Sequence, residues 1–376
     1  MQTAPSQRKG EAVDPTQAFC PKASCPARGQ AGKGTITIHS QKDQRYRCSV
    51  CRSTFSARQG TIFYRRRTDE EVMTLVVTLV AHGCPVAAIE AALGLQGRTV
   101  RGWVEAAGQH CERVHQEQVV HPRDLGQGQA DEIRAKIQGG VLWLAMAVAV
   151  PTRLWLGGVV SRERDKQLIR HLTTLIAACA QPGLLLISVD GLASYVDAVC
   201  RAFRSPQPTG RVGRPCLVPW PGVVLGQVLK QYARRRVMAV TQRLVQGTAA
   251  DLTALLATTQ GGSMLNTSSS ERLNATFRAR LALLTRRTRA LARRPALLHA
   301  SLYLVGTLYN FCTYHDSLTT AAAPHRTPAM AAGLTDHCWA VTELLWHRVP
   351  PARWAPPKRR GRRAKAVQRL IEQWAA

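Results

Sequence analysis

The apolar positions between residues 68 and 107 recur at helical spacing. Residues 72–80 carry apolar side chains at i, i+3, i+4, i+7 and i+8, which predicts one amphipathic helix. A capping box, in which each side chain bonds the other residue's backbone N–H, predicts the start of this helix at Thr68 and Glu71. Pro85–Leu93 and Arg98–Ala107 predict two more helices, and Gly94 suits the left-handed turn after the second. The inward-facing residues we expect are Val72, Leu75, Val76, Leu79, Val80, Val100, Trp103 and Val104.

Beyond residue 125 the pattern changes to short apolar runs separated by helical spacing. Val141–Val150 is apolar throughout, as expected for a strand covered on both faces. Leu154–Val160 and Leu184–Val189 predict two further strands, and Leu168–Ile176 predicts a helix between them. These elements predict one mixed α/β domain over residues 125–348.

Three segments of this region are less regular. Residues 125–137 are only partly apolar, which leaves both a strand and a surface loop open. Pro206–Pro221 is rich in Pro and Gly and predicts an insertion or a long loop. From Ser268 onward the pattern predicts a helix that continues through an arginine-rich run.

Charge points to the class of partner. The chain has 51 Lys and Arg against 23 Asp and Glu, a net charge of +28. The excess gathers in residues 198–250, 271–294 and 351–376, so the expected partner is nucleic acid rather than a membrane. No signal peptide opens the chain and no run of about 18 apolar residues occurs, so we expect a cytoplasmic, nucleoid-associated protein.

Eleven cysteines in a reducing compartment favour metal binding over disulfides. Cys20-x4-Cys25 and Cys48-x2-Cys51 form two pairs that can surround one structural Zn²⁺, and residues 35–38 and 44–47 predict strands between them. This is the layout of a zinc ribbon over residues 19–64. The alternative is four unrelated reduced cysteines; His39 is not needed, because four thiolates fill the shell.

The second and third helices fit a helix-turn-helix unit within residues 68–120. Gln96, Arg98, Thr99 and Arg101 then lie at the exposed start of the recognition helix, where they can reach DNA bases or phosphates. An ordinary three-helix packing unit is the alternative.

Acidic residues in apolar or basic surroundings are candidates for catalysis. Asp190 ends an apolar strand, and Glu271 is the one acid of an arginine-rich helix. The alternatives are a helix N-cap for Asp190 and a local ion pair with Arg272 or Arg278 for Glu271. Asp131 has a weaker local signal, and its neighbour Glu132 is not assigned a role.

With these motifs the chain resembles the DDE transposases of bacterial insertion sequences, most closely the insertion-sequence-1 family, over about residues 19–348. The most specific motif is the segment from Glu271 to Leu281 with Arg286-Arg287-Thr288. The chain departs from the pattern of that family in two places. The first cysteine pair, Cys20-x4-Cys25, has four intervening residues, and residues 205–222 are rich in Pro and Gly. The other matching motifs are Tyr46–Cys51 with Phe55, Ala130–Glu132, Val189–Gly191 with Tyr195, Tyr309–Cys312 with His315, and Thr327–Ala331.

The resemblance implies an α/β, ribonuclease H-like catalytic domain behind the zinc ribbon and the helix-turn-helix domain. In that fold the first Asp lies on the opening strand, the second at the end of the adjacent fourth strand, and the Glu on a later helix. Asp131, Asp190 and Glu271 would then hold two Mg²⁺ or Mn²⁺ ions that cleave and join DNA.

On the helix of the third motif, Glu271, Asn274 and Arg278 share one face, and Leu273, Phe277, Leu281 and Leu284 share another. Asn274 would be a polar orienting residue, and Arg278 would bind phosphate. A positive track for double-stranded DNA would be extended by Arg286, Arg287 and Arg289. Joining two DNA ends implies a homo-oligomer.

Two other functions stay open: a DNA-binding regulator or domesticated inactive transposase, and a nuclease of the same fold that does not join. Residues 1–18 are expected to be disordered. The basic segment 349–376 is either a DNA-contacting arm or a solubilising tail.

Overall fold

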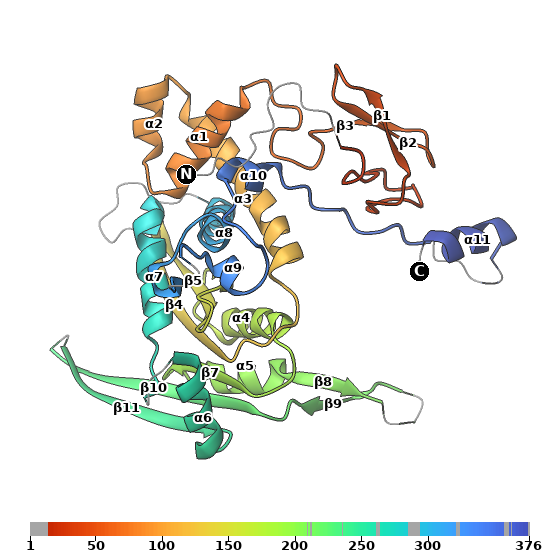
Figure 1. Ribbon diagram of the computed structural model, residues 1–376. Coiled ribbons are helices and arrows are strands. Elements are labelled where there is room, and N and C mark those ends of the chain that lie inside the picture. The colour runs from red at the N-terminus through yellow and green to blue at the C-terminus, as the bar shows by residue number, and fades with distance from the viewer. Residues whose placement is uncertain are drawn as a thin grey trace. The chain divides into compact units, whose positions relative to one another are not determined.

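The computed structural model describes residues 14–208, 210, 213–234, 236–260, 264–284, 294–320, 324–356, 361 and 363–374. The chain divides into two compact units (Figure 1). Unit 1 comprises Met1–Glu70 together with Leu345–Ala376, and unit 2 comprises Glu71–Leu344.

Unit 1 is built on a small antiparallel sheet of three strands. The strands are β1 (Ile36–Ser40), β2 (Arg45–Cys48) and β3 (Thr54–Ser56), in that order. Ile38 pairs with Tyr46, so the two strands expected between the cysteine pairs are confirmed. The C-terminal helix α11 (Lys365–Trp374) also belongs to this unit, and Trp374 is buried in its core.

Unit 2 opens with three helices: α1 (Glu70–Ala81, which begins at the last residue of unit 1), α2 (Val86–Leu93) and α3 (Gly97–Gln118). Gly94 ends α2 with a φ of 63°, as the sequence predicts. The expected buried face of α1 is partly wrong: Val76 is buried as expected, but Leu75 is 49% exposed, and Met73, Val77 and Ala81 are buried as well. Glycine at position 108 lets α3 approach another helix closely, because an added Cβ would lie 2.1 Å from the carbonyl oxygen of Ala300.

The centre of unit 2 is a six-stranded mixed sheet in the order β11-β10-β7-β4-β5-β6. Strands β4, β5 and β6 are antiparallel neighbours, β7 runs parallel to β4, β10 runs parallel to β7, and β11 is antiparallel to β10. The bounds are β4 (Gln127–Ile137), β5 (Gly140–Ala149), β6 (Trp155–Ser161), β7 (Leu185–Asp190), β10 (Val223–Ala233) and β11 (Arg236–Gln246). The expected α/β class is therefore confirmed for this unit.

Helices cover both faces of this sheet. Gly128 of β4 faces Ile176 of α4 (Lys166–Cys179), whereas its neighbour Gln129 bonds to Ser269 of α7 (Ser268–Arg280). Successive strand residues point to opposite faces, so α4 and α7 lie on opposite sides of the sheet (Figure 1). The remaining elements are α5 (Ser194–Ala202), α6 (Ala249–Gln260), α8 (Pro295–Phe311), α9 (Pro328–Ala331), α10 (Val341–Trp346), and the 3-10 turns Ala282–Leu284 and Asp316–Leu318.

Strand β4 settles the irregular segment 125–137, which is a central strand and no surface loop. Its two glutamines, Gln127 and Gln129, are buried because each has hydrogen-bond partners inside the unit. Gln127 donates to Ser188 Oγ at 2.9 Å and accepts from Thr259 Oγ1 at 2.7 Å. Polar side chains that are hydrogen-bonded in this way tolerate burial, and for that reason hydropathy alone does not reveal the strand.

Two other expectations need correction. Residues 206–221 are not simply a long loop, because β8 (Arg204–Gln207) and β9 (Cys216–Pro219) form an antiparallel pair, held at its base by Phe203 against Trp220. The helix of the third motif does not continue through the arginine-rich run: α7 ends at Arg280, and Leu281 has extended backbone.

Trp155 is the largest fully buried side chain of unit 2. Its ring packs against those of His115, Phe277 and Tyr303, which come from α3, α7 and α8. Asn310 accepts a hydrogen bond from its backbone N–H at 2.8 Å and donates one to its carbonyl oxygen at 2.9 Å. Helix α8 is thereby attached to the edge strand β6. Among the described residues, no helix combines the length and apolar character needed to cross a membrane.

Candidate metal centres

The two predicted cysteine pairs meet in unit 1. The Sγ atoms of Cys20, Cys25, Cys48 and Cys51 all lie within 4.8 Å of one another. Cys20 Sγ is 3.6 Å from Cys51 Sγ, and Cys25 Sγ is 3.8 Å from Cys48 Sγ. Thiolates about 2.3 Å from a tetrahedral Zn²⁺ have their sulfur atoms about 3.8 Å apart. The cluster could therefore bind zinc without rearrangement.

The surroundings of these thiols differ. Burial raises the pKa of Cys25 to about 11 and raises that of Cys20 further. At Cys51 burial acts in the same direction, but hydrogen bonds from the backbone and side chain of Ser53 outweigh it and lower the pKa to about 7. Because the thiolate is the form that binds metal, Cys51 reaches that form more easily than Cys20 and Cys25 do.

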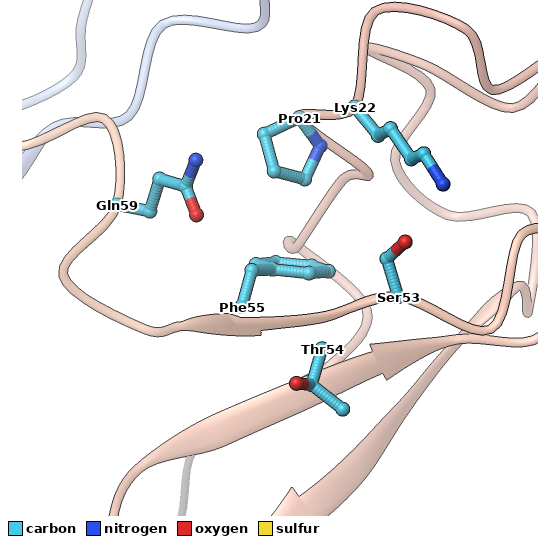
Figure 2. Close-up of a pocket in the computed structure, with 6 residues that line it drawn as sticks. All are labelled: Pro21, Lys22, Ser53, Thr54, Phe55 and Gln59. Atoms are coloured by element: carbon cyan, nitrogen blue, oxygen red, sulfur yellow. The ribbon is translucent and has the colours of Figure 1, made fainter.

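An open pocket of about 190 Å³ lies beside this cluster, between the segment that follows Cys20 and strand β3. Figure 2 shows the rings of Pro21 and Phe55 bordering it, with Gln59 on one side and Lys22 and Ser53 on the other. No metal-binding side chain lines it, so it adds nothing to the cysteine centre.

The second centre forms where β4 and β7 run side by side. These parallel strands pair Gln129 with Ser188, so Asp131 and Asp190, two residues further on, lie opposite each other on the same face. Oxygen atoms of Asp131, Glu132 and Asp190 lie within 4.8 Å of one another, a group that could bind metal ions. The sheet therefore brings together two of the three acids that the sequence singles out.

Glu132 lies in this group although the sequence gives it no role. Its side chain is only 1% exposed. Tyr195 donates its hydroxyl hydrogen to Oε1, and Arg164 donates to Oε2 from Nε at 3.0 Å and from Nη2 at 2.7 Å. The same Nη2 lies 3.2 Å from Asp190 Oδ2, so Arg164 bridges two of the acids.

Asn274 of α7 orients the first acid. Its Nδ2 donates to Asp131 Oδ2 at 2.8 Å, as expected for an orienting residue. Its Oδ1 is buried and has no hydrogen-bond partner within the described part of the chain. A buried acceptor without a donor is costly, and a water molecule bound to a cation would supply one. This orphaned atom shows that the group fits a hydrated metal ion.

Glu271 lies outside the group of three. Its carboxylate forms an ion pair with Lys230 of β10, and Oε1 also accepts from Thr267 Oγ1 at 3.0 Å. Its partner is thus Lys230, and neither Arg272 nor Arg278. The carboxylate is near enough to Asp131 to contribute to the raised pKa of that residue. Glu271 as a metal ligand stays a prediction.

Burial and like charge set the electrostatics of this centre. Burial, with the charges of Glu132, Asp190 and Glu271, raises the pKa of Asp131 to about 6. Burial also raises the pKa of Glu132, against the hydrogen bonds from Tyr195 and Arg164. Carboxylates that repel one another in this way are stabilised by a divalent cation between them.

The N-cap alternative for Asp190 is wrong, because Ala193 occupies the N-cap position of α5 and makes no side-chain capping bond. Asp190 Oδ1 accepts a hydrogen bond from the backbone N–H of Leu192 at 3.0 Å, in the turn before that helix. The second carboxylate oxygen points to Arg164 and the other acids.

The residues expected to contact DNA are distributed over three places. Arg98, Thr99 and Arg101 are all exposed at the start of α3. Arg278 is half-buried in the last turn of α7, and Asn274 bonds to Asp131. Arg286, Arg287 and Arg289 lie outside the described residues.

No pattern in the sequence marks Arg164 or Lys230 as partners of the acids. Arg164 lies between β6 and α4, and Lys230 lies on a strand that was not anticipated. The motif Val189–Gly191 with Tyr195 was the one signal that pointed toward this network. No protein-family model matches the chain, and a search of curated proteins finds no relative.

Proposed function

We propose that this chain is a DDE-type DNA transposase, which cleaves phosphodiesters at the ends of its own element and joins the freed 3′-OH to target DNA. The observation that carries the proposal is the convergence of Asp131 and Asp190 from two adjacent parallel strands, with ligand oxygens within 4.8 Å. Hard oxygen ligands of this kind suit Mg²⁺ or Mn²⁺.

The order of the sheet supports a ribonuclease H-like fold for this part of the chain. Asp131 lies in β4, the opening strand of the six-stranded sheet. Asp190 ends β7, which is the fourth strand of that sheet along the chain and lies next to β4. Glu271 follows on α7, a later helix. This is the placement that the resemblance to DDE transposases implies.

Bound divalent ions would supply activation of the attacking oxygen and charge stabilisation of the leaving oxygen in an in-line displacement. Asp131 and Asp190 would hold them, and Asn274 keeps Asp131 in place by donating to its Oδ2 at 2.8 Å. Arg164 and Tyr195 donate hydrogen bonds to the Glu132 carboxylate and fix it beside Asp131 and Asp190. Glu271 would exchange Lys230 for a cation as the third ligand.

The N-terminal half supports DNA binding. The four-cysteine cluster would hold a structural Zn²⁺ in a zinc ribbon. Helices α2 and α3 would act as a helix-turn-helix, with Arg98, Thr99 and Arg101 exposed to meet a major groove. A net charge of +28 suits the phosphate backbone of DNA, and joining two ends would require a homo-oligomer.

One observation favours a second candidate, a DNA-binding regulator without catalysis. The ion pair of Glu271 with Lys230 satisfies the third acid without any metal. A protein of this kind would bind DNA through the same helices and need no cation at Asp131 and Asp190.

A cutting and joining assay separates these functions. The purified chain is incubated with Mg²⁺, labelled DNA carrying the inverted repeats that flank its gene, and a target plasmid. We expect cut and joined products from the wild type. Asp131→Asn, Asp190→Asn and Glu271→Gln should each lower the rate about a thousandfold, since a metal ligand supplies several kcal/mol of transition-state stabilisation. DNA binding should remain.

The matched control is Asp197→Asn, which removes an exposed acid of α5 that pairs with Arg170 and Arg201. It should leave cutting and joining unchanged. Cutting without joining would identify a nuclease, and binding without cutting would identify a regulator. Near-normal cleavage by Glu271→Gln would reject Glu271 as a ligand and leave the two aspartates to be judged by their own variants.

A further inference from the structure

A second group of charged and polar side chains surrounds Tyr309 in unit 2. We call it the arginine cluster: Arg153, Arg272, Arg280, Tyr309 and His315. Arg272 and Arg280 are eight residues apart on α7 and therefore share a flank. Asn274, which bonds to Asp131, lies about 200° around the helix from Arg272. The cluster is therefore on the side of α7 turned away from the carboxylates.

Contacts from several elements fix the members of this cluster. Arg153, in the turn between β5 and β6, donates from Nη1 to Ser269 Oγ near the start of α7. Arg280 donates from Nη1 to Thr313 Oγ1 at 3.1 Å, just beyond α8. The rings of Tyr309 and His315 meet edge to face with centroids 6.0 Å apart. All three arginines lie near enough to Tyr309 for their charges to act on its hydroxyl.

The backbone at Arg153 also indicates a constraint. Its φ is 57°, in the left-handed region that costs a non-glycine residue about 1 kcal/mol. An asparagine or glycine would fit this turn with less strain. A long cationic side chain is held there instead, with its guanidinium directed at α7.

No acid in the described part of the chain forms an ion pair with Arg153, Arg272 or Arg280. The acidic group that acts on the cluster is Asp316, which is exposed and follows His315. Burial lowers the pKa of both Arg153 and Arg280. Half-buried guanidinium groups without a counter-ion are destabilising unless an anion joins them.

Tyr309 adds a neutral donor. Its side chain is buried, and its hydroxyl has no hydrogen-bond partner among the residues that the structure describes. Burial raises the pKa of this hydroxyl to about 12, against the charges of Arg153, Arg280 and Arg272. The O–H therefore keeps its proton and is available to donate one hydrogen bond.

We propose that the arginine cluster binds one phosphodiester group of a DNA strand, at a site separate from the carboxylates on the opposite flank of α7. Guanidinium groups pair with phosphate oxygens through two parallel hydrogen bonds, and the Tyr309 hydroxyl supplies a further donor. The choice of DNA over a free phosphate ion rests on the proposed function and on the charge of +28.

Salt-dependent binding of a fluorescent 30-base-pair duplex to the full chain, without Mg²⁺, tests this site. Each phosphate contact made by a charged side chain contributes about 1 to the slope of log Kd against log salt. We expect Arg153→Gln and Arg280→Gln each to lower the slope by about 1 and to weaken binding about tenfold near 0.1 M salt. Tyr309→Phe should weaken binding while leaving the slope unchanged, since it removes an uncharged donor.

Arg170→Gln is the matched control, because Arg170 lies on α4 and is paired with Asp197. Its slope should equal that of the wild type. Arg153→Lys keeps the charge and should keep the slope. Arg280→Gln and Tyr309→Phe carry the test where Arg153→Gln fails to fold. Melting curves identify such a failure.

A second arm locates the phosphate. Replacing single phosphates of the duplex by neutral methylphosphonates should weaken wild-type binding at one position and leave Arg153→Gln binding unaffected there. Competition by inorganic phosphate in the millimolar range, equal for wild type and Arg170→Gln but absent for Arg153→Gln, would instead assign the site to a free anion and overturn the DNA assignment. The proposed phosphate site would be overturned entirely if Arg153→Gln, Arg280→Gln and Tyr309→Phe folded and bound DNA with the wild-type slope and Kd.

This test is independent of catalysis. If the arginine variants show the expected slope changes but the wild type never cuts DNA, the proposed transposase function is removed and the phosphate site is kept. If cutting depends on Asp131 but the arginine variants keep the wild-type slope, the phosphate site is removed and the transposase function is kept.

Discussion

His115 is fully buried between α3 and the sheet, where its ring packs against Trp155. Its Nε2 lies 3.1 Å from the carbonyl oxygen of Leu156, and its Nδ1 has no partner among the described residues. Burial lowers the pKa of this imidazole to about 4. The ring is therefore neutral when folded, with Nε2 carrying the hydrogen that it donates to Leu156.

Acid should unfold unit 2 through this residue. A histidine whose folded pKa lies below its unfolded value of about 6.5 contributes its full stability above that pH. The contribution is then lost as the pH falls from about 6.5 toward 4, by up to about 3 kcal/mol. Urea unfolding at pH 7.5 and pH 4.5 measures the loss. His115→Gln should show a smaller difference between the two pH values, whereas His39→Gln, at an exposed position, should not. Equal acid sensitivity in both variants would contradict this account.

Single residues of the candidate centre were predictable where hydropathy marked them. Asp190 follows six residues that form an apolar run, and the structure places it at the centre. Glu132 was not predictable, because it follows Asp131 directly and neighbouring strand residues point to opposite faces. Its burial depends on Tyr195 and Arg164, which lie 63 and 32 residues away. Partners at such distances leave no local pattern.

At the scale of elements, strand β4 caps helix α7. Thr267, at the N-cap position, makes no capping hydrogen bond with its side chain. Gln129 replaces it: Oε1 accepts from the backbone N–H groups of Ser269 at 2.9 Å and Ser270 at 3.0 Å. Nε2 donates to the carbonyl oxygen of Asn266 at 2.8 Å. One buried side chain thereby fixes the start of α7, which carries both Asn274 and Glu271, against the strand of Asp131.

Gln129→Met should therefore loosen this helix. The change keeps the volume but leaves two N–H groups and one carbonyl of the helix start without partners, at a cost of about 2 kcal/mol. Chemical denaturation should show that loss, and hydrogen exchange should quicken at Ser269 and Ser270. Gln138→Met, at an exposed position, is the control. A variant as stable as the wild type would mean that water replaces the cap.

Elements were predictable where a single pattern governed them. The α2–α3 pair and the strands β5, β6 and β7 follow from apolar spacing, and the two strands between the cysteine pairs are present. Strand β4 was uncertain because its buried residues include two glutamines, Gln127 and Gln129, which interrupt the apolar pattern. The predicted buried face of α1 was partly wrong, because a largely apolar stretch offers two nearly equal faces and tertiary packing selects one of them. Strand β11 carries too many exposed residues to stand out. In β10 the first six residues are buried, but Gly226 and Gln227 interrupt their apolar run.

At the scale of the whole molecule, the chain returns to its first unit at the end. Leu345–Ala376 belongs to unit 1, although the sequence suggested a separate basic tail. Trp374 is 9% exposed and packs in one apolar cluster with Tyr46 and the cysteines. Gln30 donates from Nε2 to the carbonyl oxygen of Trp374 at 2.9 Å. No local pattern in the sequence predicts this contact, because it joins residues 344 positions apart.

The four-cysteine centre should consequently depend on the last helix for its capacity to hold zinc. Removing the indole with Trp374→Ala leaves a cavity beside the cysteines, and large-to-small changes of this kind cost about 3 kcal/mol in a core. Zinc release to a coloured chelator should quicken tenfold or more, since about 1.4 kcal/mol already corresponds to a factor of ten. Arg369→Ala, on an exposed position of the same helix, should release zinc at the wild-type rate. If Trp374→Ala kept its zinc while deletion of residues 349–376 lowered the salt slope of DNA binding, the segment would be a DNA-contacting arm and its packing in unit 1 incidental.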